Sequence, residues 1–97
     1  MNEKQETINV SFAALGQNIP NPFNQSTTIN YSLPAKFSSA RIAVTDNTGR
    51  TIKQFALTDA GKGSVNIAAN ALATGLYHYT LYVDGKMIDR KKMEIMR

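Results

Sequence analysis

Apolar and polar residues alternate along most of this chain, and the alternation predicts β-strands. Within residues 27–33 every second side chain belongs to the less polar set: Thr27, Ile29, Tyr31 and Leu33. Successive side chains of a strand point to opposite faces, so a period of two is typical of a half-buried antiparallel strand. Pro34 then ends this strand, because proline lacks the N–H that a continuing ladder would need.

Further strand patterns lie towards the C-terminus. Residues 41–45 place Ile42 and Val44 on one face, and residues 75–83 are rich in aromatic and β-branched residues. Residues 50–58 are irregular, because Ile52 and Phe55 fall on opposite faces. We therefore expect a bulge or a strong twist in that strand.

Short strands separated by turn signals predict an all-β fold. Val65 and Ile67 add a strand after two glycines, and the apolar positions at 8, 10 and 12 indicate an N-terminal strand or a linker over residues 1–14. Residues 67–73 resemble a helix, but about two turns closed by Gly75 predict a loop or a single turn instead. The pattern is typical of an immunoglobulin-like antiparallel β-sandwich of about seven short strands.

Two turns carry specific signals. Asp46-Asn47-Thr48-Gly49 follows the strand 41–45, and Gly49 can adopt a positive φ without strain. Asp84-Gly85 is a strong signal for a two-residue hairpin between residues 75–83 and 86–96.

The register of this hairpin conflicts with its own pattern. A two-residue turn pairs Leu81 with Ile88, Tyr79 with Arg90 and Tyr77 with Lys92. Met93 and Ile95 then fall on the face opposite the tyrosines. One extra residue in the second strand would correct this, so we expect a bulge near residues 89–91, or a final strand that leaves for another sheet.

Residues 15–24 do not alternate. Pro20 and Pro22 fix two backbone angles and restrict the residues before them, which indicates a stiff entry to the sandwich. We expect the side chains of Asn21 and Asn24 to cap this turn, and Phe23 to insert into the end of the core.

Composition removes several classes of function. The 97 residues are 42% hydrophobic and 19% charged, which indicates one folded domain, and no apolar run is long enough to cross a bilayer as a helix. There is no cysteine and only one histidine, His78. No carboxylate pair, triad or metal cluster stands at a useful spacing, so we expect no enzyme activity, no metal and no cofactor.

The net charge of +4 is concentrated at the C-terminus, where residues 86–97 hold five basic and two acidic side chains. A nucleic-acid site would add an aromatic and basic platform or a known motif, and neither is present. A soluble edge strand protected by lysine and arginine explains the charge more simply.

Several motifs, in order along the chain, resemble a known family. They are residues 15–23, the strand 28–34, the segment 42–50 with its Asp-x-x-Gly turn and following Arg50, the strand 75–81, Asp84-Gly85, and the basic and apolar end 91–96. Together they are similar to the type A C-terminal sorting domain of the Bacteroidetes type IX (Por) secretion system. The resemblance covers residues 15–97.

The resemblance implies a non-catalytic secretion signal that carries an attached cargo across the outer membrane. It implies an upstream cargo domain in the same polypeptide and, as partners, the type IX translocon, an outer-membrane shuttle protein and a sortase. The implied route is the periplasm in transit and then the outer-membrane surface or the extracellular space. Later cleavage and attachment of the cargo to surface lipopolysaccharide belong to the same expectation.

The residues that match the family's motifs are the candidate recognition residues: Pro20, Asn21, Pro22, Phe23, Leu33, Pro34, Asp46, Gly49, Arg50, Gly75, Tyr77, Asp84, Gly85, Lys91, Lys92, Met93 and Ile95. Each also has a structural interpretation as a turn, cap or core residue. For Asp46 and Gly49 a turn is favoured over a calcium site, because one carboxylate makes a poor cage. His78 is expected beside Lys91 on the outer face, without chemistry.

The tail, residues 91–97, is interpreted in two ways. As a recognition strand it would offer a free backbone edge to a partner strand, and this is the favoured hypothesis. As a structural strand it would belong to the core. For the domain as a whole, the alternatives to a sorting signal are an extracellular spacer, an assembly module and a carbohydrate-binding module, because a sandwich fold alone does not determine function.

Overall fold

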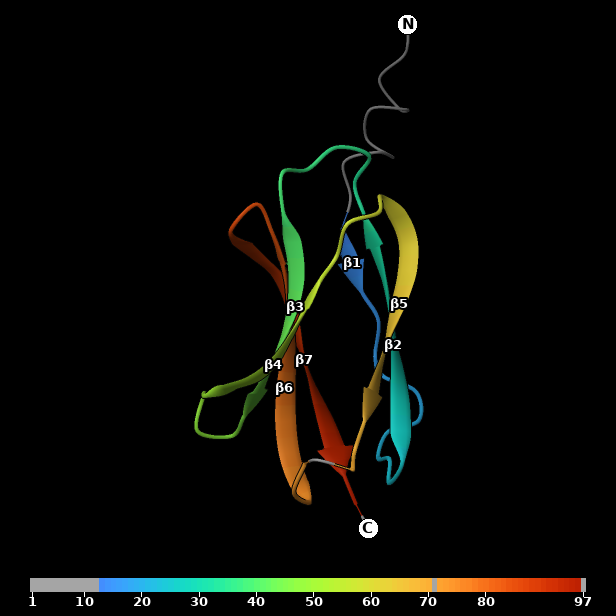
Figure 1. Cartoon of the computed structure of the whole chain (residues 1–97), viewed down its shortest axis with the longest axis vertical. Helices are drawn as coiled ribbons and strands as arrows, with labels where there is room; N and C mark the ends of the chain where they lie inside the picture. The colour runs from blue at the N-terminus through green and yellow to red at the C-terminus, as the bar shows by residue number, and fades with distance from the viewer. Residues whose placement is uncertain (1–12, 71, 97) are drawn as a thin grey trace, which may run out of the picture.

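The computed structural model describes residues 13–70 and 72–96, so the N-terminal strand expected from positions 8, 10 and 12 lies outside the described residues. Within that part of the chain there are seven strands (Figure 1): β1 Ala14–Leu15, β2 Ser26–Leu33, β3 Ala40–Asp46, β4 Thr51–Ala56, β5 Gly61–Ala68, β6 Gly75–Val83 and β7 Lys86–Ile95.

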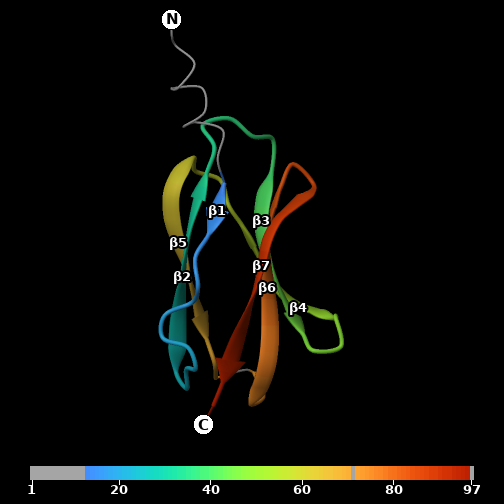
Figure 2. The ribbon, with the colours of Figure 1, turned by 180° about the vertical axis from the view of Figure 1, so that it is seen from behind.

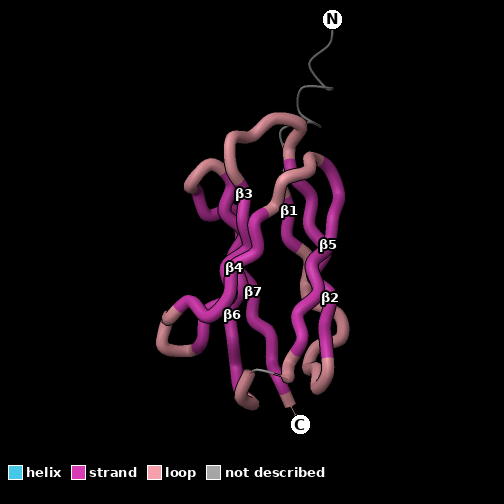
Figure 3. Tube along the Cα trace, viewed as in Figure 1, coloured by secondary structure: helices cyan, strands magenta, loops and turns pink. Residues whose placement is uncertain are grey.

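The strands form two sheets that face each other (Figures 1 and 2). One sheet has the order β1-β2-β5 and the other the order β4-β3-β6-β7. All neighbouring strands within the sheets are antiparallel. The tube in Figure 3 consists of strands and loops, without a helix among the described residues. The predicted all-β sandwich of seven strands is confirmed.

The core fills the space between the two sheets, and alternation selects its members. Thr27, Ile29 and Leu33 of β2 are buried as predicted, and Tyr31 is half-buried. From the other sheet, Ile42 and Val44 are fully buried. Burial of such side chains is the main favourable term in folding, so the alternating pattern determines which face of each strand turns inward.

The β6–β7 hairpin contains the expected extra residue, but earlier than predicted. Tyr82 pairs with Met87 and Leu81 pairs with Asp89, so Ile88 is the bulged residue. The predicted pairs of Leu81 with Ile88, Tyr79 with Arg90 and Tyr77 with Lys92 are therefore wrong. Tyr79 instead pairs with Lys91, and Tyr77 with Met93. The shift returns Met93 and Ile95 to the core face, where their exposed fractions are 1% and 0%.

The irregularity expected between Ile52 and Phe55 is also present. Val44 pairs with Lys53 and Thr45 pairs with Thr51, which leaves Ile52 as the extra residue of β4. The bulge lies next to the β3–β4 turn, where it lets both Ile52 and Phe55 contact the core.

The apolar stretch 67–73 is not a packed helix. Ile67 and Ala68 complete β5, and Ala69 is buried just after it. No helix in the described part of the chain has the length and hydropathy needed to span a membrane.

Candidate functional site

The residues singled out from the sequence divide between the two ends of the sandwich (Figures 1 and 2). We call the end formed by residues 18–24, 46–51, 72–77 and 93–96 the lower end. The upper end is formed by residues 34–39, 57–60 and the β6–β7 hairpin. Most candidate recognition residues lie at the lower end, although they come from distant parts of the chain.

At the lower end, the β3–β4 turn is organised by the Asp46 carboxylate. Asp46 Oδ1 accepts hydrogen bonds from the Thr48 hydroxyl at 2.6 Å and from the N–H groups of Thr48 at 2.9 Å and Arg50 at 3.1 Å. The bond from the Thr48 hydroxyl lowers the pKa of Asp46 and outweighs the effect of partial burial, which raises it. The carboxylate is therefore occupied in closing its own turn.

Gly49 adopts a φ of 92°, which favours glycine, as expected for this turn. The Arg50 side chain lies 3.6 Å from Asp46 and is largely exposed, so the ion pair contributes little to stability. Among the described residues no group of three or more acidic, histidine or cysteine side chains could hold a metal ion.

The start of β6 lies beside this turn. Gly75 has a φ of 152°, and the Tyr77 hydroxyl donates a 2.6 Å hydrogen bond to the Ala73 carbonyl, which holds the preceding loop against the strand. Between this loop and the β3–β4 turn is a hollow of about 380 Å³. Asp46, Arg50, Gly75 and Tyr77, predicted separately, all line it.

Residues 15–24, which we call the proline segment, close the lower end on its other side. Phe23 is buried in the core as predicted, and its backbone pairs with Ile95 of β7. The Phe23 N–H donates to the Glu94 carbonyl at 3.0 Å, and the Met96 N–H donates to the Phe23 carbonyl at 2.9 Å. The segment thus passes from the edge of one sheet to the edge of the other.

Asn21 does not cap its own turn, contrary to the prediction. Its side-chain oxygen accepts a 2.9 Å hydrogen bond from the Glu94 N–H. Gln17 donates to the Lys92 carbonyl at 2.7 Å, so side chains as well as backbone attach the segment to β7. Pro20, Pro22, Phe23 and Met96 surround a second, smaller hollow at this end. The Ile19-Pro20 and Asn21-Pro22 peptide bonds are both cis.

The hypothesis that the tail offers a free edge needs correction over residues 93–96. Met93 and Ile95 belong to the hydrophobic core, and the backbone at Glu94 and Met96 is already bonded to the proline segment. The structural interpretation of the tail therefore holds for this part of β7. Its physical reason is that the bulge at Ile88 turns both apolar side chains inward.

Lys91 and Lys92 do not form one basic site. Lys91 pairs with Tyr79 on the inner side of the sheet and lies 3.6 Å from the Asp89 carboxylate, whereas Lys92 pairs with His78 on the outer face. His78 therefore lies beside Lys92. The expectation that it would lie beside Lys91 is wrong. The one-residue bulge accounts for this difference too.

Sequence reasoning missed a buried polar network behind the proline segment. The Tyr79 hydroxyl donates to the Gly16 carbonyl at 2.7 Å and accepts from the Asn18 N–H at 2.8 Å. The Asn18 amide in turn donates to the hydroxyl of Thr27 at 3.0 Å. Burial raises the pKa of Tyr79 to about 12, so the phenol stays protonated and acts as a donor. The polar pair Gln17-Asn18 beside the prolines is the only trace of this network in the sequence.

The remaining candidates lie at the upper end and have structural roles there. Leu33 is a core residue, and Pro34 directly follows β2. Asp84, with a φ of 51°, and Gly85, with a φ of 80°, form the predicted hairpin turn. Asp84 Oδ1 also accepts hydrogen bonds from the N–H groups of Ser38 and Ser39, which ties the hairpin to the β2–β3 loop.

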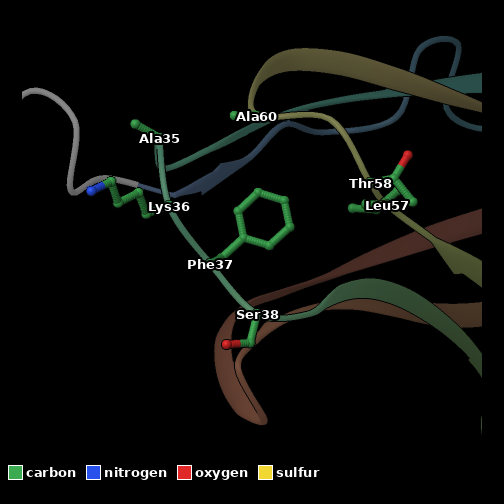
Figure 4. Close-up of a pocket in the computed structure, with 7 residues that line it drawn as sticks. All are labelled: Ala35, Lys36, Phe37, Ser38, Leu57, Thr58 and Ala60. Atoms are coloured by element: carbon green, nitrogen blue, oxygen red, sulfur yellow. The ribbon is translucent and has the colours of Figure 1, made fainter.

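A hollow of about 460 Å³ at the upper end lies between residues 35–38 and 57–60. Figure 4 shows the Phe37 ring pointing into it, with Leu57 and Ala60 around the ring. Lys36 is the one charged residue among those that line it. The hydroxyl-bearing residues Ser38 and Thr58 complete its lining, so the hollow is part polar and part apolar.

Comparisons with known proteins add two findings. A family model described as "Secretion system C-terminal sorting domain" matches residues 18–95. Among solved structures, the BSP domain of a biofilm associated protein superposes with a TM-score of 0.58 at 15% identity, over 84% of this chain and 15% of the other. The chain thus spans about one seventh of that structure, and the likeness concerns the fold alone. No curated protein matches the sequence.

Proposed function

The chain belongs to the family of type IX secretion C-terminal sorting domains, and on this premise we propose that its lower end is the surface read by the secretion machinery. Membership makes the domain a C-terminal sorting signal for export to the outer membrane or the extracellular space. The family is generally non-catalytic.

The observation that carries this proposal is the convergence of the motif residues. Asp46, Arg50, Gly75 and Tyr77 border one hollow, and Pro20, Pro22 and Phe23 border the other, both at the same end of the sandwich. A partner docked there would contact elements from the first, middle and last thirds of the chain at once. Such a composite surface exists only in the folded domain, so recognition would require the sorting domain itself to be folded.

The exposed side chains at this end supply apolar contacts around the polar turn. Leu76 borders the larger hollow with 42% of its surface exposed, and Met96 borders the smaller one with 51% exposed. Apolar side chains beside a rigid, hydrogen-bonded turn suit a protein partner, because interface cores are apolar and their rims polar. The proposed partners are the translocon and an outer-membrane shuttle protein of the type IX system.

The same proposal extends to the steps after export. A sortase would cleave between the cargo and the domain, upstream of residue 15, and attach the cargo to the cell surface. Residues 1–14 would then be the linker, and residues 15–97 the address that is removed.

Transplantation tests the proposal. Residues 15–97 are fused behind a periplasmic reporter with an ordinary signal peptide, in a type IX-competent bacterium and in its translocon-deficient counterpart. The reporter is expected at the surface or in the medium of the competent strain only. An intact fusion retained in the periplasm of both strains would refute the proposed function.

A further inference from the structure

The outer face of the four-stranded sheet, which points away from the other sheet, carries a patch that we call the dish, because small side chains at its centre are flanked by longer ones. We define it by neighbouring positions on three strands: Arg41, Ala43 and Thr45 of β3, His78, Thr80 and Tyr82 of β6, and Arg90 and Lys92 of β7. Arg41 pairs with Tyr82, Ala43 with Thr80, and Thr45 with His78. None of these eight residues lines either hollow of the lower end.

The floor of the dish is made of small side chains. Ala43 and Thr80 are both buried, although alternation turns them away from the core. Because they are buried on this outer face, longer side chains of neighbouring residues must cover them. Arg90, the neighbour of Thr80 on β7, is one of these neighbours and is itself exposed.

The rim of the dish is cationic. Arg41, Arg90 and Lys92 are exposed, and none of them belongs to the ion pairs found among the described residues. The guanidinium of Arg41 lies over the Tyr82 ring, 4.1 Å from its centre, which restricts its motion and favours a fixed position. Burial, together with Arg90 and Lys92, lowers the pKa of His78, so the imidazole is neutral at pH 7 and lies within the field of both cations.

Two polar atoms in the dish lack partners. Thr45 Oγ1 and His78 Nδ1 are buried and make no hydrogen bond within the described part of the chain. They belong to residues paired across β3 and β6. Buried polar atoms of folded proteins are nearly always hydrogen-bonded, so each unpaired one requires an explanation. A ligand that brings its own hydroxyl groups would satisfy both atoms once the Thr45 and His78 side chains rotate to expose them, because both atoms are buried in the unliganded chain.

We propose that this face binds an anionic polysaccharide, with its acidic groups on Arg41, Arg90 and Lys92 and its hydroxyls on Thr45 and His78. Hydrogen bonds between cationic donors and acidic oxygens are strong. Lys92 lies opposite His78 and Arg90 lies two positions along β7, whereas Arg41 lies at the other end of the face beside Tyr82. This inference goes beyond the proposed sorting function and does not depend on it.

Other classes of partner fit the face less well. The centre of a protein interface is usually apolar or aromatic, whereas this floor is Ala43 and Thr80. Single-stranded nucleic acid binds by stacking bases on free aromatic rings, but the face of Tyr82 is covered by Arg41. A chain of acidic sugars needs only cations and hydroxyl partners.

Calorimetric titration of the purified chain tests the proposal. The probe is a short dextran sulfate, with unmodified dextran of the same length as its neutral counterpart. We expect binding to dextran sulfate alone. The variant R41Q/R90Q/K92Q should bind about tenfold or more weakly, because three charged contacts are lost. The control K36Q/K53Q/K62Q removes the same charge outside this face and should keep its affinity to within about threefold.

A second variant separates recognition from general attraction. Thr45→Val keeps the shape and every charge but removes one unpaired hydroxyl. It should weaken binding about threefold without lowering the melting temperature, because an unpaired buried hydroxyl does not stabilise the fold. Equal losses in the two triple variants would overturn the proposal, because attraction would then depend on net charge alone. Single-stranded DNA that binds as tightly as dextran sulfate would also overturn it.

Discussion

The hydroxyl of Tyr79, a residue of β6, connects the four-stranded sheet to the proline segment. It donates to Gly16 and accepts from Asn18, and the residue is fully buried. A buried donor or acceptor that loses its partner costs the full desolvation penalty of that group. This single atom therefore determines how firmly the proline segment is held.

Tyr79→Phe tests this role with almost no change of volume. It should lower the free energy of unfolding by about 1–3 kcal/mol, because the Gly16 carbonyl and the Asn18 N–H lose their partner. Chemical denaturation measures the loss. Tyr82→Phe on the outer face is the control and should change stability by no more than about 0.5 kcal/mol. If the two variants had the same free energy of unfolding, the hydrogen bonds of Tyr79 would make no net contribution to stability.

His78 makes stability depend on pH in a definite direction. Its pKa is lowered in the folded chain from an ordinary value of 6.5 by burial and then by Arg90 and Lys92. Between the folded pKa and 6.5 the unfolded chain binds more protons, so stability decreases as the pH falls through this window.

Replacing His78 with Gln should remove the decrease just below pH 6.5, as followed by thermal melts at closely spaced pH values. Asp46 contributes only at lower pH, because its pKa is lowered from 3.8. A decrease of the same size in His78→Gln and in the parent chain would show that another group is responsible.

At the scale of the elements, the bulge at Ile88 determines which side chains of β7 face the core. Without it, the two-residue turn at Asp84-Gly85 would point Met93 and Ile95 to solvent. With it, both are buried and the proline segment pairs alongside. A shift by one residue moves a whole strand's side chains to the other face.

Deletion of Ile88 should therefore leave the core intact, because the residue that it removes is the extra one. Tyr82 stays opposite Met87 and Leu81 stays opposite Asp89, so Met93 and Ile95 keep their inward faces. The deletion should keep cooperative unfolding in circular dichroism melts, and the control Ile88→Ala, which changes only an exposed side chain, should cost less than about 1 kcal/mol. A deletion variant that loses cooperative unfolding would contradict the register.

These elements indicate how far the sequence predicts the fold. The alternation of side chains between the two faces of β7 required one extra residue, because Met93 and Ile95 had to be buried. The alternation did not locate this residue, since a bulge at any position between the turn and Met93 restores the same faces. The structure places it at Ile88, close to the turn, and no local sequence pattern indicates that position.

The candidate site was predicted in its parts but not in its assembly. The Asp46 turn and the burial of Phe23 followed from local chemistry. The bond from Glu94 to Asn21 joins residues 73 positions apart and depends on how the sheets meet, so no local pattern indicates it. The hydrogen bonds of Asn18 and of the Tyr79 hydroxyl were missed for the same reason.

At the scale of the whole molecule, the sandwich has two ends with different residues and different roles. The upper end holds turns and a hollow formed by Phe37 and Leu57, whereas the lower end gathers the motif residues of the family. The proposed sorting function assigns recognition to the lower end. Exposed apolar residues exist at both ends, which provides a matched comparison.

The most direct test compares two double variants of the reporter fusion. L76S/M96S alters the lower end, where 42% and 51% of these side chains are exposed, and M87S/I88S alters the upper hairpin, where 61% and 40% are exposed. Both variants should keep their thermal unfolding, to within about 0.5 kcal/mol each, because surface substitutions cost little.

Export of the fused reporter is the measurement. We predict that L76S/M96S lowers it about fivefold or more, the effect of losing about 1 kcal/mol of contact with the partner, while M87S/I88S leaves it near the parent level. Equal export of the two folded variants, or a larger loss from M87S/I88S, would contradict recognition through the lower end.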